Sequence, residues 1–112
     1  MCLMELWDEI KVETALLDRT VRELKHRGED KARKEHDYRV ALSKRLTVLR
    51  AEGNPVTNLS DIARGEPEIA RLRLDRDIAD SLYQSCIEGI NVQKLKIRVL
   101  EGQLSREWGN TK

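Results

Sequence analysis

The chain has no phenylalanine and little of the other residues that build turns and aromatic cores. Its 112 residues include two tryptophans, two tyrosines, two prolines and six glycines. Barrels and sandwiches need frequent turns and large packing side chains, so this composition argues against both. The abundant residues are leucine, arginine, glutamate, isoleucine, aspartate and lysine, which favour long helices. A chain of this length has room for a single domain, 1–112.

Cysteine, net charge and long apolar runs are also scarce. Cys2 and Cys86 lie far apart without neighbouring ligand residues, so we expect reduced thiols and neither a disulfide framework nor a zinc site. No charge-free stretch exceeds about eight residues, whereas a bilayer span needs roughly 20. We therefore expect a cytoplasmic protein without a membrane segment. The 21 basic and 20 acidic residues leave a formal charge of +1, which argues against nonspecific DNA binding.

Glycine and proline are concentrated near the middle of the chain. Gly53-Asn54-Pro55 and Gly65-Glu66-Pro67 bracket a short segment, and the long flanks contain no proline. This punctuation predicts a helix over about 3–51, an ordered loop with a short helical turn over about 52–66, and a helix over about 67–108. The fold class is all-α, a long antiparallel helical hairpin of coiled-coil type.

Apolar residues recur at seven-residue spacing along both predicted helices. Leu3, Ile10, Leu17 and Leu24 follow this spacing in the first helix. The second helix carries two adjacent seams, a wider apolar surface than one partner helix covers. We therefore expect the hairpin to assemble into a multi-helix bundle, most simply a dimer, and the alternative is a monomer with a partly exposed stripe. The residues assigned to the core and the oligomer are Leu42, Leu46, Leu72, Tyr83, Cys86, Ile90, Ile97, Leu100 and Leu104. The second seam comprises Leu74, Ile78, Leu82, Val92 and Val99.

The placement of charge favours antiparallel helices. Residues 5–18 carry five acids and one base, and residues 94–106 carry four bases and one acid. An antiparallel hairpin brings these segments together, whereas a parallel one sets like charges against each other. In the register that we predict, Leu49 lies opposite Ile69 and Gly28 lies near Gly89 and Ile90. Trp7 and Trp108 then meet at the open end, where we expect mutual packing; the alternative is an exposed binding surface.

Catalytic and metal-binding patterns are nearly absent. His26 and His36 are ten residues apart and project from different sides of a helix, so they do not form a metal-binding pair. The arginines and aspartates within residues 71–80 are expected to form ion pairs at three- and four-residue spacing. We expect no enzyme activity, no cofactor and no metal.

The connecting segment is longer than a turn requires and contains apolar residues, which predicts an ordered cap. Ser60 and Asp61 are expected to cap a helical turn that ends at Gly65, followed by Pro67 as the first residue of the second helix. Arginines collect around this cap, where they would suit a phosphate-bearing ligand or an acidic partner. The alternative is that Asp61, Glu66, Asp75 and Asp77 neutralise them. The candidate binding residues are Arg39, Arg45, Thr57, Asn58, Ser60, Arg64, Arg71, Arg73 and Arg76.

The chain resembles a group of small helical-hairpin proteins encoded by phages and prophages of Gram-positive bacteria. The similar residues include Asp37–Leu42, Gly53–Thr57, Ser60–Gly65, Ile69–Arg73 and Arg106–Trp108. The resemblance implies a phage origin and an accessory role. Our leading hypothesis is an oligomeric binding protein that counters host defence by sequestering a nucleotide-like ligand or a host protein. The alternatives are an accessory protein of phage DNA replication or recombination, and a structural assembly or chaperone coiled coil.

Overall fold

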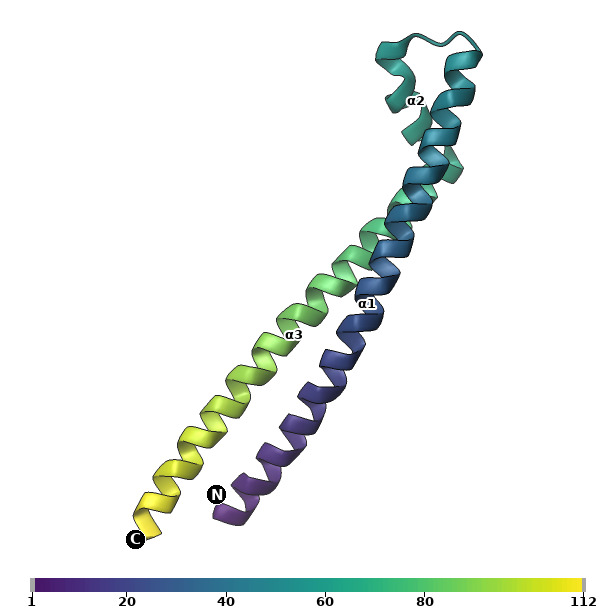
Figure 1. Ribbon diagram of the computed structural model, residues 1–112. Helices are drawn as coiled ribbons and strands as arrows, with labels where there is room; N and C mark the ends of the chain where they lie inside the picture. Colours follow the sequence, from purple (N-terminus) through teal and green to yellow (C-terminus); the bar gives the residue numbers. More distant parts are fainter. Residues whose placement is uncertain (1, 112) are drawn as a thin grey trace. The chain divides into compact units, whose positions relative to one another are not determined.

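The computed structural model describes residues 2–111, whose regular structure is helical. Helix α1 spans Leu3–Ala51, the 3-10 helix η1 spans Val56–Asn58, α2 spans Leu59–Gly65 and α3 spans Pro67–Thr111 (Figure 1). The two long helices are antiparallel. The predicted all-α class and the bounds of the first helix are confirmed, and the second helix continues three residues beyond the predicted end at residue 108.

A glycine terminates α1. Gly53 has a φ of +89°, a conformation that favours glycine because it lacks a Cβ atom. The Gly53 amide donates to the carbonyl of Arg50, and the Asn54 amide donates to that of Leu49. The Asn54 side chain also donates to the Leu49 carbonyl, at 3.0 Å. These bonds form a Schellman motif, which satisfies carbonyls that the end of the helix leaves without partners.

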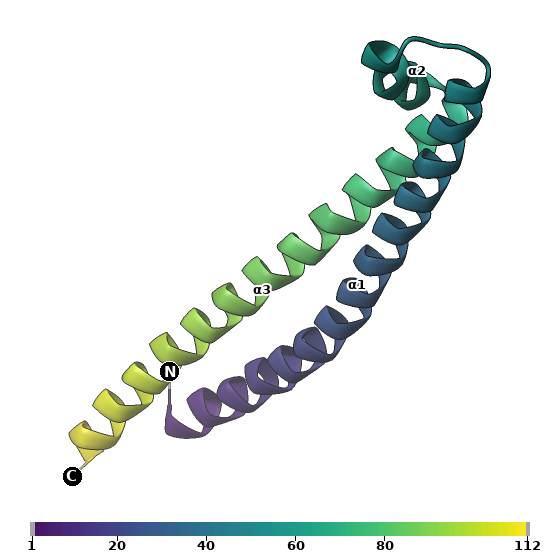
Figure 2. The same cartoon turned by 45° about the horizontal axis from the view of Figure 1, so that its top comes forward.

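The connecting segment folds back onto α1 (Figure 2). Leu59 and Ala63 of α2 are buried against Leu49, which confirms an ordered cap. The expected Ser60 cap is wrong, because α2 begins at Leu59 and Ser60 lies within the helix. The N-cap is Asn58, which makes no side-chain capping bond. Leu59 is the first residue of α2, and its apolar side chain is buried against Leu49. The helix ends at Gly65, as predicted.

The chain forms two compact units. One contains the chain up to His26 and from Gln84 onward, and the other contains Arg27–Tyr83. Each includes a stretch of α1 and a stretch of α3. Leu6, Ile10 and Ile90 are buried in the first unit. The buried side chains of the second are Tyr38, Leu49, Leu59, Ala63, Ile69 and Ala79. Of the predicted core residues, Ile90 is buried, and Leu42, Leu46, Leu72, Tyr83, Cys86, Ile97, Leu100 and Leu104 are half-buried.

The register between the long helices differs from the prediction by about one heptad. Lys31 Nζ lies 3.1 Å from Asp80, and a Cβ added to Gly28 would meet the Tyr83 ring at 3.4 Å. Gly28 therefore faces Tyr83 and not the predicted Gly89 and Ile90. A shift of seven residues keeps the same apolar seams in contact, so the seams alone do not distinguish the two registers.

Cysteines and tryptophans lie in the first unit. Cys2 and Cys86 are free thiols, and Cys86 Sγ lies 3.5 Å from the Thr20 carbonyl. Trp7 and Trp108 are 50% and 57% exposed. Both line one apolar groove of about 440 Å³ together with Leu3, Met4 and Leu104.

Large apolar side chains remain exposed in both units. Among them are Val12, Val21, Leu74, Ile78, Leu95 and Val99. Such exposure favours self-association, because association removes apolar surface from water. No helix in the described residues has the length and apolarity to cross a membrane.

The buried contact between α1 and α2 is testable by truncation. We expect Leu49→Ala to lower the free energy of unfolding by about 2–5 kcal/mol, because it leaves a cavity beside Leu59 and Ala63. Urea unfolding followed by circular dichroism measures the change. The neighbouring Val48 is 44% exposed, so Val48→Ala is the matched control, with an expected change within about 0.5 kcal/mol. Equal effects of the two substitutions would contradict the assigned core.

Candidate functional site

Four arginine side chains surround one recess in the second unit. The recess has a volume of about 170 Å³, and no carboxylate lines it. We call it the arginine recess, and its lining residues are Tyr38, Arg39, Leu42, Arg64, Arg73 and Arg76. This arrangement concentrates positive charge in a chain that is nearly neutral as a whole.

Three helices contribute these arginines. Arg39 is on α1, Arg64 is on α2, and Arg73 and Arg76 are on α3. Burial of Ala63 fixes α2 against α1, and Arg64 is the next residue. Arg73 and Arg76 are three residues apart, so they are neighbours on the surface of α3. The recess therefore depends on the folded-back position of α2.

The guanidinium of Arg76 is held on three sides. It donates to Asp77 at 2.9 and 3.1 Å and lies 3.5 Å from Glu35. It also lies over the ring of Tyr38, 4.6 Å from the centroid, a cation–π geometry. Hydrogen bonding to Asp77 and the nearby charge of Glu35 raise the pKa of Arg76. This side chain is pre-positioned and carries a permanent charge.

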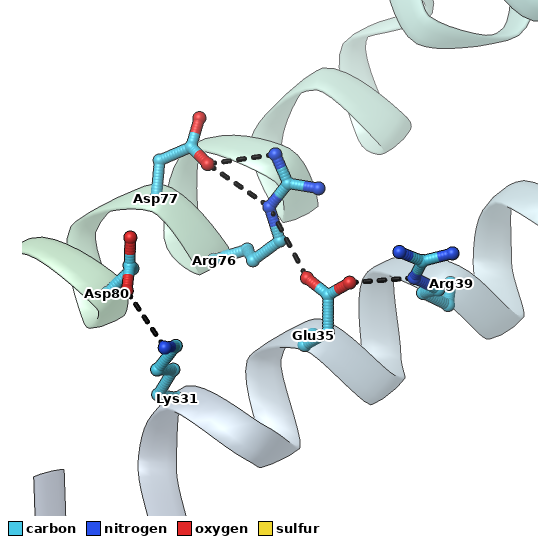
Figure 3. A network of polar contacts seen from close by, with 6 residues as sticks. All are labelled: Lys31, Glu35, Arg39, Arg76, Asp77 and Asp80. Carbon is cyan, nitrogen blue, oxygen red and sulfur yellow. Dashed lines mark hydrogen bonds and ion pairs between the residues drawn. The ribbon is translucent and has the colours of Figure 1, made fainter. Parts of the chain in front are cut away.

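Glu35 connects two of the four arginines. Arg39 Nε donates to one Glu35 oxygen at 2.7 Å, and Arg76 approaches the other. Figure 3 shows Glu35 between the two arginines, with the ion pair of Lys31 and Asp80 nearby. The network ties α1 to α3 and orients two of the charges that line the recess.

The other two arginines have no such partner. Within residues 2–111, neither Arg64 nor Arg73 forms an ion pair or a side-chain hydrogen bond. Both side chains belong to exposed residues. They leave the arginine recess with an excess of positive charge and with free guanidinium donors.

A second recess adjoins the first. It has a volume of about 550 Å³ and shares Arg39 and Leu42 with the arginine recess. We call it the hydroxyl recess because the remaining lining includes three hydroxyl side chains. Its other lining residues are Ser43, Leu46, Thr47, Arg50, Val56, Leu59 and Ser60. No carboxylate lines it either, so the two recesses form one cationic surface with an apolar floor.

The structure brings together about half of the predicted binding residues. Arg39, Ser60, Arg64, Arg73 and Arg76 line the two recesses. Thr57 and Asn58 are exposed in η1 and line neither. Arg71 is exposed on α3, also outside them.

Arg45 has a partner elsewhere. Its Nε donates to both oxygens of Glu66 at 2.7 and 2.8 Å, and this hydrogen bonding raises the pKa of Arg45. The prediction that acids neutralise the arginines is thus confirmed for Arg45 with Glu66 and for Arg76 with Asp77. It is wrong for Arg64 and Arg73, which have no carboxylate within ion-pair distance in residues 2–111.

The predicted ion pairs along α3 are also different. Arg76 pairs with the adjacent Asp77 and with Glu35 of α1. Asp80 pairs with Lys31 of α1. The expected pairs at three- and four-residue spacing are absent from the described part of 71–80, where Arg76 and Asp80 have other partners.

Sequence reasoning missed Ser43, Thr47 and Glu35. Ser43 and Thr47 follow Arg39 at successive four-residue steps, which places all three along one side of a helix. This four-residue spacing is a signal in the sequence that places Ser43 and Thr47 on the same side of the helix as Arg39. His26 and His36 are exposed, and no group of three metal-binding side chains occurs in the part of the chain that the structure describes.

No known protein family matches the chain, and neither the curated proteins nor the solved structures contain a significant match.

The pair of Arg45 and Glu66 has a structural role that charge exchange tests. We expect Arg45→Glu to lower the urea midpoint, because it sets two carboxylates against each other where α3 begins. Combining Arg45→Glu with Glu66→Arg restores opposite charges, so the double variant should recover most of the lost stability. A double variant no more stable than Arg45→Glu alone would show that the pair does not stabilise the fold.

Proposed function

We propose that this protein is a non-enzymatic binding protein that holds a nucleotide-like ligand across the arginine recess and the hydroxyl recess. The observation that carries the proposal is the pair of arginines, Arg64 and Arg73, beside a recess without a carboxylate. Charges of one sign that line a recess raise the local potential and attract ions of the opposite sign. Unpaired guanidinium groups that converge on one recess therefore favour an external anion.

Phosphate is the anion that suits this geometry. A guanidinium presents a planar fork of donors that binds two phosphate oxygens at once. Arg76 is already held by Glu35, Asp77 and Tyr38, so it loses little conformational freedom when a ligand binds. Arg64 and Arg73 would supply the additional donors and the excess charge.

The hydroxyl recess suits the rest of a nucleotide. Its volume of about 550 Å³ lies within the range of small-molecule sites. Leu46, Val56 and Leu59 offer an apolar surface for a base, and the hydroxyls of Ser43, Thr47 and Ser60 offer hydrogen bonds for a sugar. Arg39 lies at the boundary of the two recesses and would contact the linking phosphate.

We further propose that the chain is a phage or prophage protein, as the resemblance of its sequence implies. A small protein that binds a nucleotide without transforming it removes that nucleotide from solution. We propose that the ligand is a signal of a host defence system and that sequestration counters this defence. Binding of a host protein at the same recesses is the related alternative.

A nucleic-acid accessory role is the second candidate, and one observation favours it. Arg39 and Arg50 both line the hydroxyl recess, so a basic strip runs along the last turns of α1. Contacts of this kind with a phosphate backbone make affinity strongly dependent on salt. Salt dependence therefore separates the two candidates.

Charge reversal tests the proposed nucleotide site. We expect Arg64→Glu combined with Arg73→Glu to weaken binding of ATP or a cyclic dinucleotide by about 30-fold or more, because it removes two charge-assisted contacts. Isothermal titration calorimetry measures the affinity. Arg71→Glu changes the charge of the same helix outside both recesses and is the matched control, with affinity close to that of the unchanged protein.

Purification from bacterial cells provides an unbiased check. Native mass spectrometry should show a retained ligand with absorbance near 260 nm, and the Arg64/Arg73 double variant should lack it. Nucleotide affinities that are equal for both arginine variants would overturn the proposed site. Salt-sensitive binding of a single-stranded DNA oligonucleotide that Arg39→Glu with Arg50→Glu abolishes would favour the accessory role.

A further inference from the structure

One side of α3 carries a stripe of exposed apolar side chains, of which Val92, Leu95 and Val99 also line a recess with Glu9 and Glu13 of α1. Its side chains occur in both units and are between 41% and 59% exposed. The stripe consists of Leu74, Ile78, Leu82, Val92, Leu95 and Val99. It is distinct from the seam that contains the buried Ala79 and Ile90. Large apolar side chains repeated at helical spacing indicate a surface that packs against another helix.

The stripe is palindromic along the helix. Because α3 is one uninterrupted helix from Pro67 to Thr111, its residues can be compared about a central point. The central point lies between Cys86 and Ile87. The pairs that lie at equal or nearly equal distances on either side of it are Leu74 with Val99, Ile78 with Leu95, and Leu82 with Val92.

We propose that this stripe binds the same stripe of a second copy of this chain. The two α3 helices run antiparallel, and the twofold axis of the dimer passes between Cys86 and Ile87. In a twofold interface, each residue meets its counterpart from the other copy, so a self-complementary pattern is required. The palindromic order supplies it at the two ends of the stripe, where Leu74 lies opposite Val99 and Ile78 lies opposite Leu95 of the second copy.

Charge along both edges of the stripe supports this occupant and this direction. Asp75 and Lys96 lie along the same edge of the stripe, because each directly follows a stripe residue, Leu74 or Leu95. The antiparallel register therefore places Asp75 beside Lys96 of the second copy. Asp77 and Arg98 lie along the other edge, because each directly precedes a stripe residue, Ile78 or Val99. The same register places Asp77 beside Arg98 of the second copy. Symmetry repeats both pairs at the other end of the interface. Parallel α3 helices would form none of these pairs.

The centre of the stripe has small side chains. Ser81, Ser85 and Gly89 lie between the two apolar ends, and the register sets Leu82 opposite Gly89 of the second copy. A Cβ added to Gly89 would meet no atom of its own chain within 4 Å, so the space beside it is open to a partner. Glu88 lies opposite Ser85 of the second copy, whose hydroxyl can donate to the carboxylate. Small residues allow the helices to approach closely at the axis.

The dimer interface and the proposed nucleotide site occupy different sides of α3. With Ile78 at position a of a heptad and Leu74 at position d, Arg73 falls at position c and Arg76 at position f. Positions c and f point away from a helix that packs on a and d. Dimerisation therefore leaves the arginine recess open, and sedimentation measures dimerisation without any ligand present.

Mixing two charge variants tests the interface. Sedimentation velocity of the full chain at micromolar concentration should give a dimer. Asp75→Lys with Asp77→Lys in one variant, and Lys96→Glu with Arg98→Glu in another, each set like charges against each other. We expect each variant alone to dimerise at least about tenfold more weakly, because four exposed ion pairs per dimer are lost. Mixed together, the two variants restore all four pairs and should form a heterodimer as stable as the original dimer.

The rescue is specific to the antiparallel register. A monomeric chain at about 100 μM, or a mixture that associates no better than its components, would overturn the proposal. Circular dichroism of each variant verifies that the helices form. Lys96 lines a recess with Glu9 and Glu13, so Asp77→Lys mixed with Arg98→Glu provides the same test without changing Lys96. The same heterodimer is expected, and its absence again overturns the proposal.

Discussion

The burial of Leu59 and Ala63 against Leu49 is the contact on which the organisation of the second unit depends. Without it, Leu59 and Ala63 would be exposed in a solvated connection. With it, α2 lies against α1, and Arg64 is fixed at the edge of a recess that Arg39, Arg73 and Arg76 also line. A contact of three apolar side chains thus determines where four charges meet. The Schellman motif at Gly53 sets the direction in which the chain leaves α1, and Pro67 starts α3 in a helical conformation.

The sequence predicts the helices well because their signals are local. Proline is absent from the interior of both helices, glycine terminates α1, and apolar residues recur at seven-residue spacing. The register is a different matter, since a seven-residue shift leaves the same seams in contact. Lys31 with Asp80, Glu35 with Arg76 and Arg45 with Glu66 distinguish the registers. These pairs form between residues 21 to 49 positions apart in the chain, so no local pattern identifies them in advance.

The sequence predicts the type of site, but it predicts less well which residues line it. Clustered arginines beside an ordered cap indicated an anion-binding surface, and four of them line one recess. Arg45 and Arg71 are both arginines close to the connecting segment, yet one pairs with Glu66 and the other lies outside both recesses. Whether an arginine is free to line the recess depends on which carboxylates the tertiary structure brings within its reach. Glu35 illustrates this, because it is an ordinary acidic residue in the sequence and becomes the link between Arg39 and Arg76 only when α3 packs beside α1.

Three sides of α3 differ in chemical character, so the proposed dimer interface and the proposed ligand site use different side chains of this helix. One side carries the seam with Ala79 and Ile90, a second carries the exposed palindromic stripe, and a third carries Arg73 and Arg76. A helix that served only an intrachain hairpin would need one apolar seam, and its other sides would be polar. The second apolar stripe is therefore a cost in solubility unless another helix covers it. Because the stripe complements itself in both apolar residues and charge, a second copy satisfies that requirement and leaves the arginines free to face a ligand.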